Sequence, residues 1–132
     1  MGVHDTRIFT GKGSKKDLVL ELCEDEDLFE SIKVGMMSNK VKKVSVKEVN
    51  GKIKFGGVNY ILGSQYKSKD LEGETVMGAS GHYELKGAKA DQLFGALHVV
   101  INIGGKKTVV TLTRGIAKEG LKIRLGFIDV IE

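Results

Sequence analysis

The chain has 132 residues and a formal net charge of +4, with 41% hydrophobic and 29% charged residues. This length suits one compact domain with its own core, and the composition is typical of a soluble protein rather than a disordered or membrane one. No apolar run approaches the roughly 18 residues that cross a bilayer, and the N-terminus lacks the features of a secretory signal. Cys23 is the only cysteine, which excludes an intramolecular disulfide. We therefore expect one domain over residues 1–132, in the cytoplasm and without a membrane partner.

The first predicted elements form an N-terminal hairpin. Residues 6–9 and 17–22 have strand character, and residues 11–14 between them have the composition of a turn. Within this hairpin, residues 1–15 are expected to form a loosely attached arm.

A helix is the next predicted element. Apolar residues recur at helical spacing from Leu28 to Met37, and the helix is expected to end near Asn39. The four carboxylates of residues 24–27 suit a helix start, with Asp25 as the predicted N-cap. Adjacent carboxylates at such a position more often complement the helix dipole than bind a cation, so we favour the structural role.

Strand periodicity returns after the helix. Residues 41–49 and 53–62 are predicted strands, and Asn50-Gly51 between them is the strongest two-residue hairpin signal. Because both residues can take positive φ, a tight turn is expected there. The polar residues 63–73 are expected to form a surface loop.

The C-terminal part of the chain is predicted to be mostly strand. Residues 75–85 form one strand, and residues 86–94 are expected to be a loop with a helical turn at 91–94. Three successive strands follow, over residues 97–103, 110–113 and 121–127. Their period-2 pattern with Gly-rich turns predicts an antiparallel sheet with one buried face. The expected fold class is therefore α+β (α/β), with one main helix against a mainly antiparallel sheet.

Two groups of basic residues are candidate nucleic-acid contacts, because lysine-rich surfaces attract phosphates. On the strand over residues 41–49, Lys43 and Lys47 alternate with valines and so share a solvent-facing side. The full candidate set is Lys40, Lys42, Lys43, Lys47, Lys52, Lys54, Lys106, Lys107, Arg114, Lys122 and Arg124. The competing interpretation is a solvated sheet face guarded against aggregation, since few aromatic residues interleave and arginine is scarce.

A second candidate site, for a small anionic ligand, consists of His98, Asn102 and Arg114. His98 lies opposite the apolar side of its strand. A core or interface histidine is favoured over a metal ligand or proton carrier, because no second ligand is identified. The same holds for His82 at the end of another strand.

The remaining reactive patterns are weak. Cys23 precedes four carboxylates, which would raise the pKa of its thiol, so a packed side chain is favoured over a nucleophile. Residues 11–14 and 104–108 are similar to a phosphate-binding loop, but their spacing does not match and we expect hairpin turns. No catalytic set, metal site or cofactor is predicted.

Three short segments stand out, namely an acidic, Leu-rich helix start at residues 26–32, a strand ending in a Ser-Gly step at residues 74–81 and a Leu-His strand at residues 97–99. Together they resemble the PPC domain, the plant-and-prokaryote-conserved domain. The likeness in order and spacing covers residues 16–132. Residues 108–115 depart from it, because many prokaryotic members carry a Gly-Gly-His-Leu phrase there. Of the histidines that can surround a metal in the family, only His98 remains.

The resemblance implies a highly curved, mainly antiparallel sheet packed against the helix, a homotrimer and a prokaryotic DNA-binding label. The AT-hook that contacts DNA in plant members is absent, because the chain has no Arg-Gly-Arg-Pro element and no proline. Three functions stay open. They are a homotrimeric module that binds DNA nonspecifically through lysine, a binder of a small anionic metabolite at a cleft between subunits and, least favoured, an enzyme.

Overall fold

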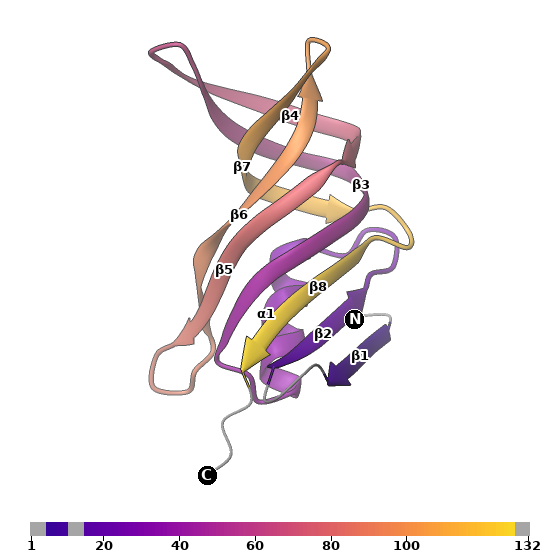
Figure 1. Ribbon diagram of the computed structural model, residues 1–132, viewed down its shortest axis with the longest axis vertical. Coiled ribbons are helices and arrows are strands. Elements are labelled where there is room, and N and C mark those ends of the chain that lie inside the picture. The colour runs from indigo at the N-terminus through magenta and orange to yellow at the C-terminus, as the bar shows by residue number, and fades with distance from the viewer. Residues whose placement is uncertain (1–4, 11–14, 129–132) are drawn as a thin grey trace.

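The computed structural model describes residues 5–10 and 15–128, which form eight strands and one helix. In chain order these are β1 (Asp5–Thr10), β2 (Lys15–Glu21), α1 (Leu28–Ser38), β3 (Lys43–Leu62), β4 (Gln65–Val76), β5 (Gly78–Lys86), β6 (Gln92–Ile103), β7 (Lys106–Ala117) and β8 (Lys122–Ile128). The strands pair antiparallel and curve around one side of the helix (Figure 1). A mainly antiparallel sheet with one helix was expected. Within the described residues, no helix has the length and apolar run needed to cross a membrane.

The sheet has two parts that share the 20-residue strand β3. In the first part the strand order is β1-β2-β8-β3. In the second part the order is β3-β5-β6-β7, and β7 also pairs with β3. Residues 45–50 of β3 pair with β8, whereas residues 53–59 pair with β7. Strand β4 pairs with β3 along the second part (Figure 1). One strand therefore contributes to two differently oriented surfaces.

The hairpin predicted at Asn50-Gly51 is wrong, because β3 continues through both residues. Asn50 pairs with Lys122 of β8, and Gly51 pairs with Val76 of β4. Gly51 has a φ of 137°, a conformation that side-chain-bearing residues rarely adopt. A Cβ atom there would lie 2.9 Å from the Leu121 Cα atom. The Asn-Gly step is the position at which β3 changes partners, so its glycine permits a bend rather than a reversal.

The loop predicted over residues 63–73 is also wrong, since most of it belongs to β4. The turn that joins β3 to β4 is confined to residues 63–64, and Gly63 has a φ of 63°. Strand β4 carries few apolar side chains because it lies beside β3 and pairs with no other described strand. Only Leu71 and Val76 of β4 are buried. Periodic burial, the signal that identifies a strand in sequence, is therefore weak there.

The loop predicted over residues 86–94 is shorter than expected. Strand β5 extends to Lys86 and β6 begins at Gln92, and these two residues pair with each other. The helical turn predicted at residues 91–94 is wrong, because the backbone of residues 92–94 is extended and hydrogen-bonds with β5.

The N-terminal hairpin and the three C-terminal strands are confirmed. All six residues of β1 pair with β2, from Asp5 opposite Glu21 to Thr10 opposite Lys16. The C-terminal strands are β6, β7 and β8. The predicted turn at residues 11–14 lies outside the described residues. How firmly residues 1–15 are attached stays a prediction.

The N-cap of α1 is Asp27, two residues after the predicted one. Its carboxylate accepts hydrogen bonds from the backbone N–H groups of Phe29 and Glu30, at 2.8 and 3.1 Å. Asp25 has a φ of 71°, outside the extended conformation of an N-cap, and its carboxylate pairs with Lys54. The acidic run therefore supplies both the helix cap and an ion-pair partner for β3.

Helix α1 packs on the concave side of the sheet through Leu28, Ile32 and Met36, which are fully buried. It contacts β2 and β7, and Figure 1 shows it behind β2, β8 and β3. Gly35 permits a close approach to β2, since a Cβ atom there would lie 2.7 Å from the Leu20 Cδ2 atom. The helix and both parts of the sheet thus share one core.

Candidate anion-binding surface

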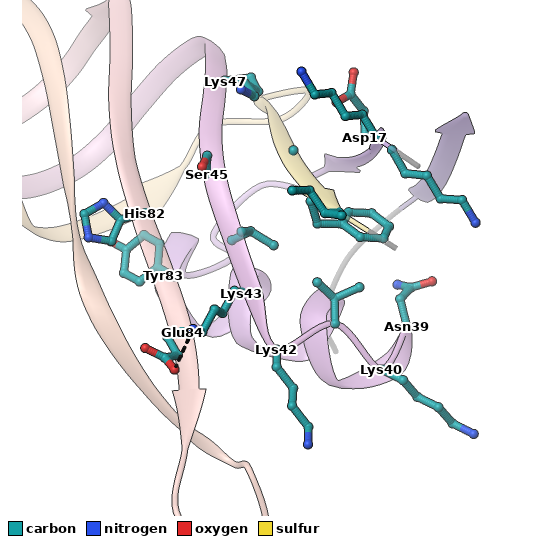
Figure 2. A pocket seen from close by; sticks show the side chains of 17 residues that line it. Asp17, Asn39, Lys40, Lys42, Lys43, Ser45, Lys47, His82, Tyr83 and Glu84 are labelled. Carbon is teal, nitrogen blue, oxygen red and sulfur yellow. Dashed lines mark ion pairs between the residues drawn. The ribbon is translucent and has the colours of Figure 1, made fainter. Parts of the chain in front are cut away.

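An open depression of about 1060 Å³ lies where the end of α1, the beginning of β3 and parts of β2, β5 and β8 meet (Figure 2). Its lining contains six lysines, namely Lys15, Lys16, Lys40, Lys42, Lys43 and Lys47. Two carboxylates, Asp17 and Glu84, also line it, so the formal net charge of the lining is +4. This equals the net charge of the whole chain. We call this surface the lysine depression.

Strand β3 supplies two of the lysines through its alternating side chains. Lys43, Ser45 and Lys47 are exposed, whereas Val44 and Val46 are buried. This confirms the alternation predicted from the sequence. Because inward valines fix the register of the strand, the two lysines must point to solvent.

The segment between α1 and β3 supplies two more lysines. Asn39, the C-cap of α1, donates a side-chain hydrogen bond to the Gly35 carbonyl at 2.7 Å, and Lys40 follows with a φ of 57°. Figure 2 shows Lys40 and Lys42 extending from this segment. Lys40 lies beside the helix C-terminus, whose partial negative charge favours a cation. A role in helix stability is therefore compatible with a role in binding.

Most of these lysines keep their charge available. The Lys43 Nζ atom lies 3.8 Å from Glu84 Oε2 (Figure 2), but 77% of the Lys43 side chain is exposed, so water screens this pair. No ion pair within the described residues involves Lys15, Lys40, Lys42 or Lys47. An anion would not have to displace an acidic partner from them.

Lys54, another predicted contact, is neutralised by the loop between β2 and α1. Its Nζ atom donates to Asp25 Oδ1 at 2.7 Å and lies 3.0 Å from Glu24 Oε2. The hydrogen bond with Asp25, and then the one with Glu24, raise the pKa of Lys54. The backbone N–H of Glu119 donates to Glu24 at 2.7 Å, and this bond, followed by the one from Lys54, lowers the pKa of the Glu24 carboxyl. Lys54 therefore holds a loop in place.

Arg114 and Lys122 also have acidic partners. The Arg114 Nη2 atom donates to Asp70 Oδ1 at 2.9 Å, and the Lys122 Nζ atom lies 3.7 Å from Glu21 Oε2. The other predicted contacts outside the lysine depression are exposed, and these are Lys52, Lys106, Lys107 and Arg124.

The two predicted lysine groups do not form one surface. Lys106 and Lys107 begin β7 at the hairpin that ends one pole of the molecule, whereas the lysine depression lies toward the opposite pole, at the beginning of β3 (Figure 1). Only Lys40, Lys42, Lys43 and Lys47 of the predicted set gather in the depression.

Lys15 and Lys16 also line the lysine depression and were not predicted. His82, which was interpreted as a core or interface histidine, lines it too. The two lysines begin β2, and the pairing of β2 with β8 brings them to this end of the sheet. The sequence feature that could have identified them is a pair of lysines at the start of an alternating strand. To place this pair in the lysine depression, one must know which strands are neighbours in the sheet, and this depends on long-range pairing.

The candidate ligand set His98, Asn102 and Arg114 has partners within the chain. The His98 Nδ1 atom lies 3.1 Å from Thr111 Oγ1, and the Asn102 side-chain Oδ1 atom accepts a hydrogen bond from the Gly105 N–H at 2.8 Å. Asn102 thus stabilises the turn between β6 and β7. His98 is half-buried on the outer face, opposite its buried neighbours, as expected. As a ligand site the three residues stay a prediction.

Cys23 and Glu26 form a local structural contact. Oε1 of the buried Glu26 carboxylate accepts a hydrogen bond from the Cys23 N–H at 2.8 Å. Partial burial, and then a hydrogen bond with Glu26, raise the pKa of the Cys23 thiol. The direction is the one expected, although burial rather than the neighbouring charges is the main cause. In the described part of the chain, no three His, Cys, Asp or Glu side chains gather so that they could hold a metal ion.

No protein-family model and no curated protein matches this sequence. Solved structures do match it. A metal-containing protein from Archaeoglobus fulgidus superposes with a TM-score of 0.68 at 16% identity, over 95% of this chain and 85% of that one. A plant- and prokaryote-conserved (PPC) protein from Pyrococcus horikoshii gives 0.67 at 19% identity, over 100% and 87%. A "putative dna binding protein" from Bacteroides thetaiotaomicron gives 0.64 at 11% identity, over 96% and 85%. At these identities the likeness concerns the fold, and the chain forms a PPC-like domain.

Proposed function

We propose that this chain is a homotrimeric binding module that holds DNA without sequence preference through the lysine depression. The observation that carries the proposal is the lining itself, in which six lysines face two carboxylates. Lysines that neutralise phosphates release condensed counterions, and this gain does not depend on sequence. The description of the structural neighbour from Bacteroides thetaiotaomicron as a "putative dna binding protein" supports the choice of DNA among polyanions.

The chemistry of the lysine depression favours phosphate contacts over base recognition. No arginine lines it within the described residues, and arginine is the side chain that most often pairs with guanine. Tyr83 is buried, so its ring is not available for stacking on a base. Lysine ammonium groups act as flexible point charges, which suits a backbone contact.

The homotrimer follows from the family resemblance and is part of the proposal. A trimer would present the lysine depression three times. Several weak contacts on one DNA molecule bind with an effective concentration set by their spacing, so the whole would bind more tightly than one copy.

The proposal makes the chain a binding module rather than an enzyme. The alternative, a small anionic ligand held by His98, Asn102 and Arg114, is not favoured by the geometry, because Arg114 pairs with Asp70 and the Asn102 side chain stabilises the turn between β6 and β7.

A salt titration of duplex binding tests the proposal. The variant Lys40→Gln/Lys42→Gln/Lys47→Gln removes three exposed charges from the lysine depression. Its matched control, Lys52→Gln/Lys106→Gln/Lys107→Gln, removes three exposed lysines that do not line it. If each lost lysine contacts one phosphate, the slope of log K against log salt falls by about 0.9 per lysine, and the control changes it less. Equal losses in both variants, or no binding by the unmodified chain at low salt, would contradict the proposal.

A further inference from the structure

Part of the outer surface of the second sheet region is almost free of charge. Residues 55–66, 92–105 and 108–113 contain no Asp, Glu, Lys or Arg, in a chain in which 29% of residues are charged. On β3, β4, β6 and β7, six outward side chains from these residues define what we call the neutral face. They are Asn59, Ile61, Tyr66, His98, Val109 and Thr111.

A row of polar side chains crosses the neutral face. His98 is opposite Thr111, Thr111 is opposite Asn59, and Asn59 is opposite Ser68, so all four point to the same side of the sheet. His98 lies within hydrogen-bond distance of Thr111 at 3.1 Å, and the Ser68 hydroxyl donates to Asn59 Oδ1 at 2.8 Å. Each of these side chains can both donate and accept, so the row has capacity left for further hydrogen bonds.

Large apolar side chains lie beside this row. Ile61 and Tyr66 are each 70% exposed and stand directly opposite one another, and Val109 is 65% exposed. Ile61 lies two residues after Asn59, and Val109 lies two residues before Thr111 on the antiparallel neighbour. Both are therefore displaced from the row in the same direction. Exposed apolar side chains that gather in this way mark an interaction surface.

The charges that border the neutral face do little to change its character. The charges of Arg114 and Asp70 compensate each other, because Arg114 Nη2 lies 2.9 Å from Asp70 Oδ1. Lys106 and Lys107 lie at the turn between β6 and β7, at the rim of the neutral face. A polyanion or an anionic lipid surface would find few cations here, so the occupant must be a surface of the same mixed apolar and uncharged kind.

We propose that the neutral face is the surface through which copies of this chain contact one another, and this inference rests on the homotrimer proposed above. Each copy carries a formal net charge of +4, so approach through lysine-rich surfaces would be repulsive. The neutral face permits contact without that repulsion. Interface cores are depleted in charged residues, as this face is, and they often contain tyrosine, which this face supplies once at Tyr66. Donor and acceptor groups in the polar row can be satisfied by those of a second copy.

Light scattering after size exclusion, without DNA, tests this assignment. Val109→Lys and Tyr66→Lys each place a charge on the neutral face at a side chain that is exposed in the single chain, so the fold should be unaffected. Ile128→Lys is the matched control, because Ile128 is 66% exposed and lies on β8. Far-UV circular dichroism checks that all three variants fold. We expect the unmodified chain and the control at three times the 14.3 kDa chain mass, and both neutral-face variants shifted toward a single chain.

The outcomes separate this inference from the proposed function. Trimers in all four proteins would overturn the assignment of the neutral face while leaving the homotrimer intact. A single-chain mass for the unmodified protein would overturn both the homotrimer and this inference. The salt titration of DNA binding is a separate measurement, so its failure would leave the interface assignment standing.

Discussion

The lysine depression and the neutral face occupy the outside of the same curved sheet but differ in charge. The lysine depression carries a formal net charge of +4, whereas the neutral face has no formal charge of its own. Both are built on exposed side chains that alternate with buried ones, so the inner half of the pattern is the same. The difference shows that burial determines which way a strand faces, whereas the outward residues determine what it can bind.

Strand β3 contributes to both surfaces. Its first residues supply Lys43 and Lys47, and its last residues supply Asn59 and Ile61. The bend at Gly51 separates these two stretches and lets them pair with different neighbours. A contact with DNA should weaken as salt screens it, whereas an uncharged contact between copies should not. The two surfaces can therefore be tested independently.

The largest expected effect comes from breaking the bend between the two surfaces. Gly51→Ala forces a side chain into a positive φ and against the backbone of Leu121, so we expect a loss of about 3 kcal/mol in the free energy of unfolding. Gly63→Ala is the control, because Gly63 also has a positive φ but nothing lies within 4 Å of its added Cβ. It should lose about 1 to 2 kcal/mol. Urea denaturation measures both, and equal losses would mean that the close approach at Gly51 is unimportant.

The next effect concerns the helix that supports both parts of the sheet. Asp27→Ala removes the N-cap hydrogen bonds to Phe29 and Glu30, and we expect it to lower the free energy of unfolding by about 1 kcal/mol. Asp25→Asn removes the charge of the exposed ion pair with Lys54 and tolerates the positive φ of this residue, so it should lower the free energy of unfolding by about 0.5 kcal/mol or less. Chemical denaturation of the two variants should preserve this order. A larger loss for Asp25→Asn would mean that the ion pair of Asp25 contributes more than the helix cap.

A smaller effect tests the uncharged character of the neutral face. Asp70→Asn leaves Arg114 without its acidic partner at the border, which should change the stability of the single chain by less than about 1 kcal/mol. Because each copy then gains a positive charge beside the neutral face, the trimer should dissociate at a higher protein concentration. Glu21→Gln, which frees Lys122 away from this face, is the control. Sedimentation at several concentrations compares them, and equal shifts would argue against a specific role for the border pair.

The smallest expected effect is a change in how stability depends on pH. The hydrogen bonds to Glu24 lower its pKa in the folded chain, so their contribution is present above the ordinary value of 4.5 and is lost as pH falls through the lowered pKa. Glu24→Gln lacks this contribution at every pH. The difference in unfolding free energy between the two proteins should therefore be present at neutral pH and fade on strong acidification. A difference that does not change with pH would show that ionisation of Glu24 is not its source.

Much of the fold was predictable because side-chain burial produces a periodic pattern of apolar residues in the sequence. The alternation in β3, β6 and β8 and the helical spacing from Leu28 to Met36 each depend only on local sequence, and the structure confirms them. The Asn50-Gly51 step was misinterpreted, because the same positive φ that suits a tight turn also suits a bend in a continuous strand. Local preference alone does not separate these two uses.

The candidate site was less predictable than the fold. The exposed lysines of β3 followed from alternation, but the grouping of Lys15 and Lys16 with them depends on how β2, β8 and β3 are ordered in the sheet. The ion pairs of Lys54 and Arg114 join residues 29 and 44 positions apart, so no local sequence pattern indicates that these cations have acidic partners. Both the grouping of the lysines and the ion pairs depend on long-range contacts, which only the folded chain defines.

The central claim is that one surface holds DNA by charge and another joins copies without it. Light scattering of the unmodified protein mixed with a short duplex tests this most directly. At about 50 mM salt we expect a complex of three chains with DNA, and at about 500 mM salt three chains without DNA, because only the phosphate contacts are strongly screened. Loss of the trimer and of the DNA at the same salt concentration, or a single chain at every concentration, would contradict the account.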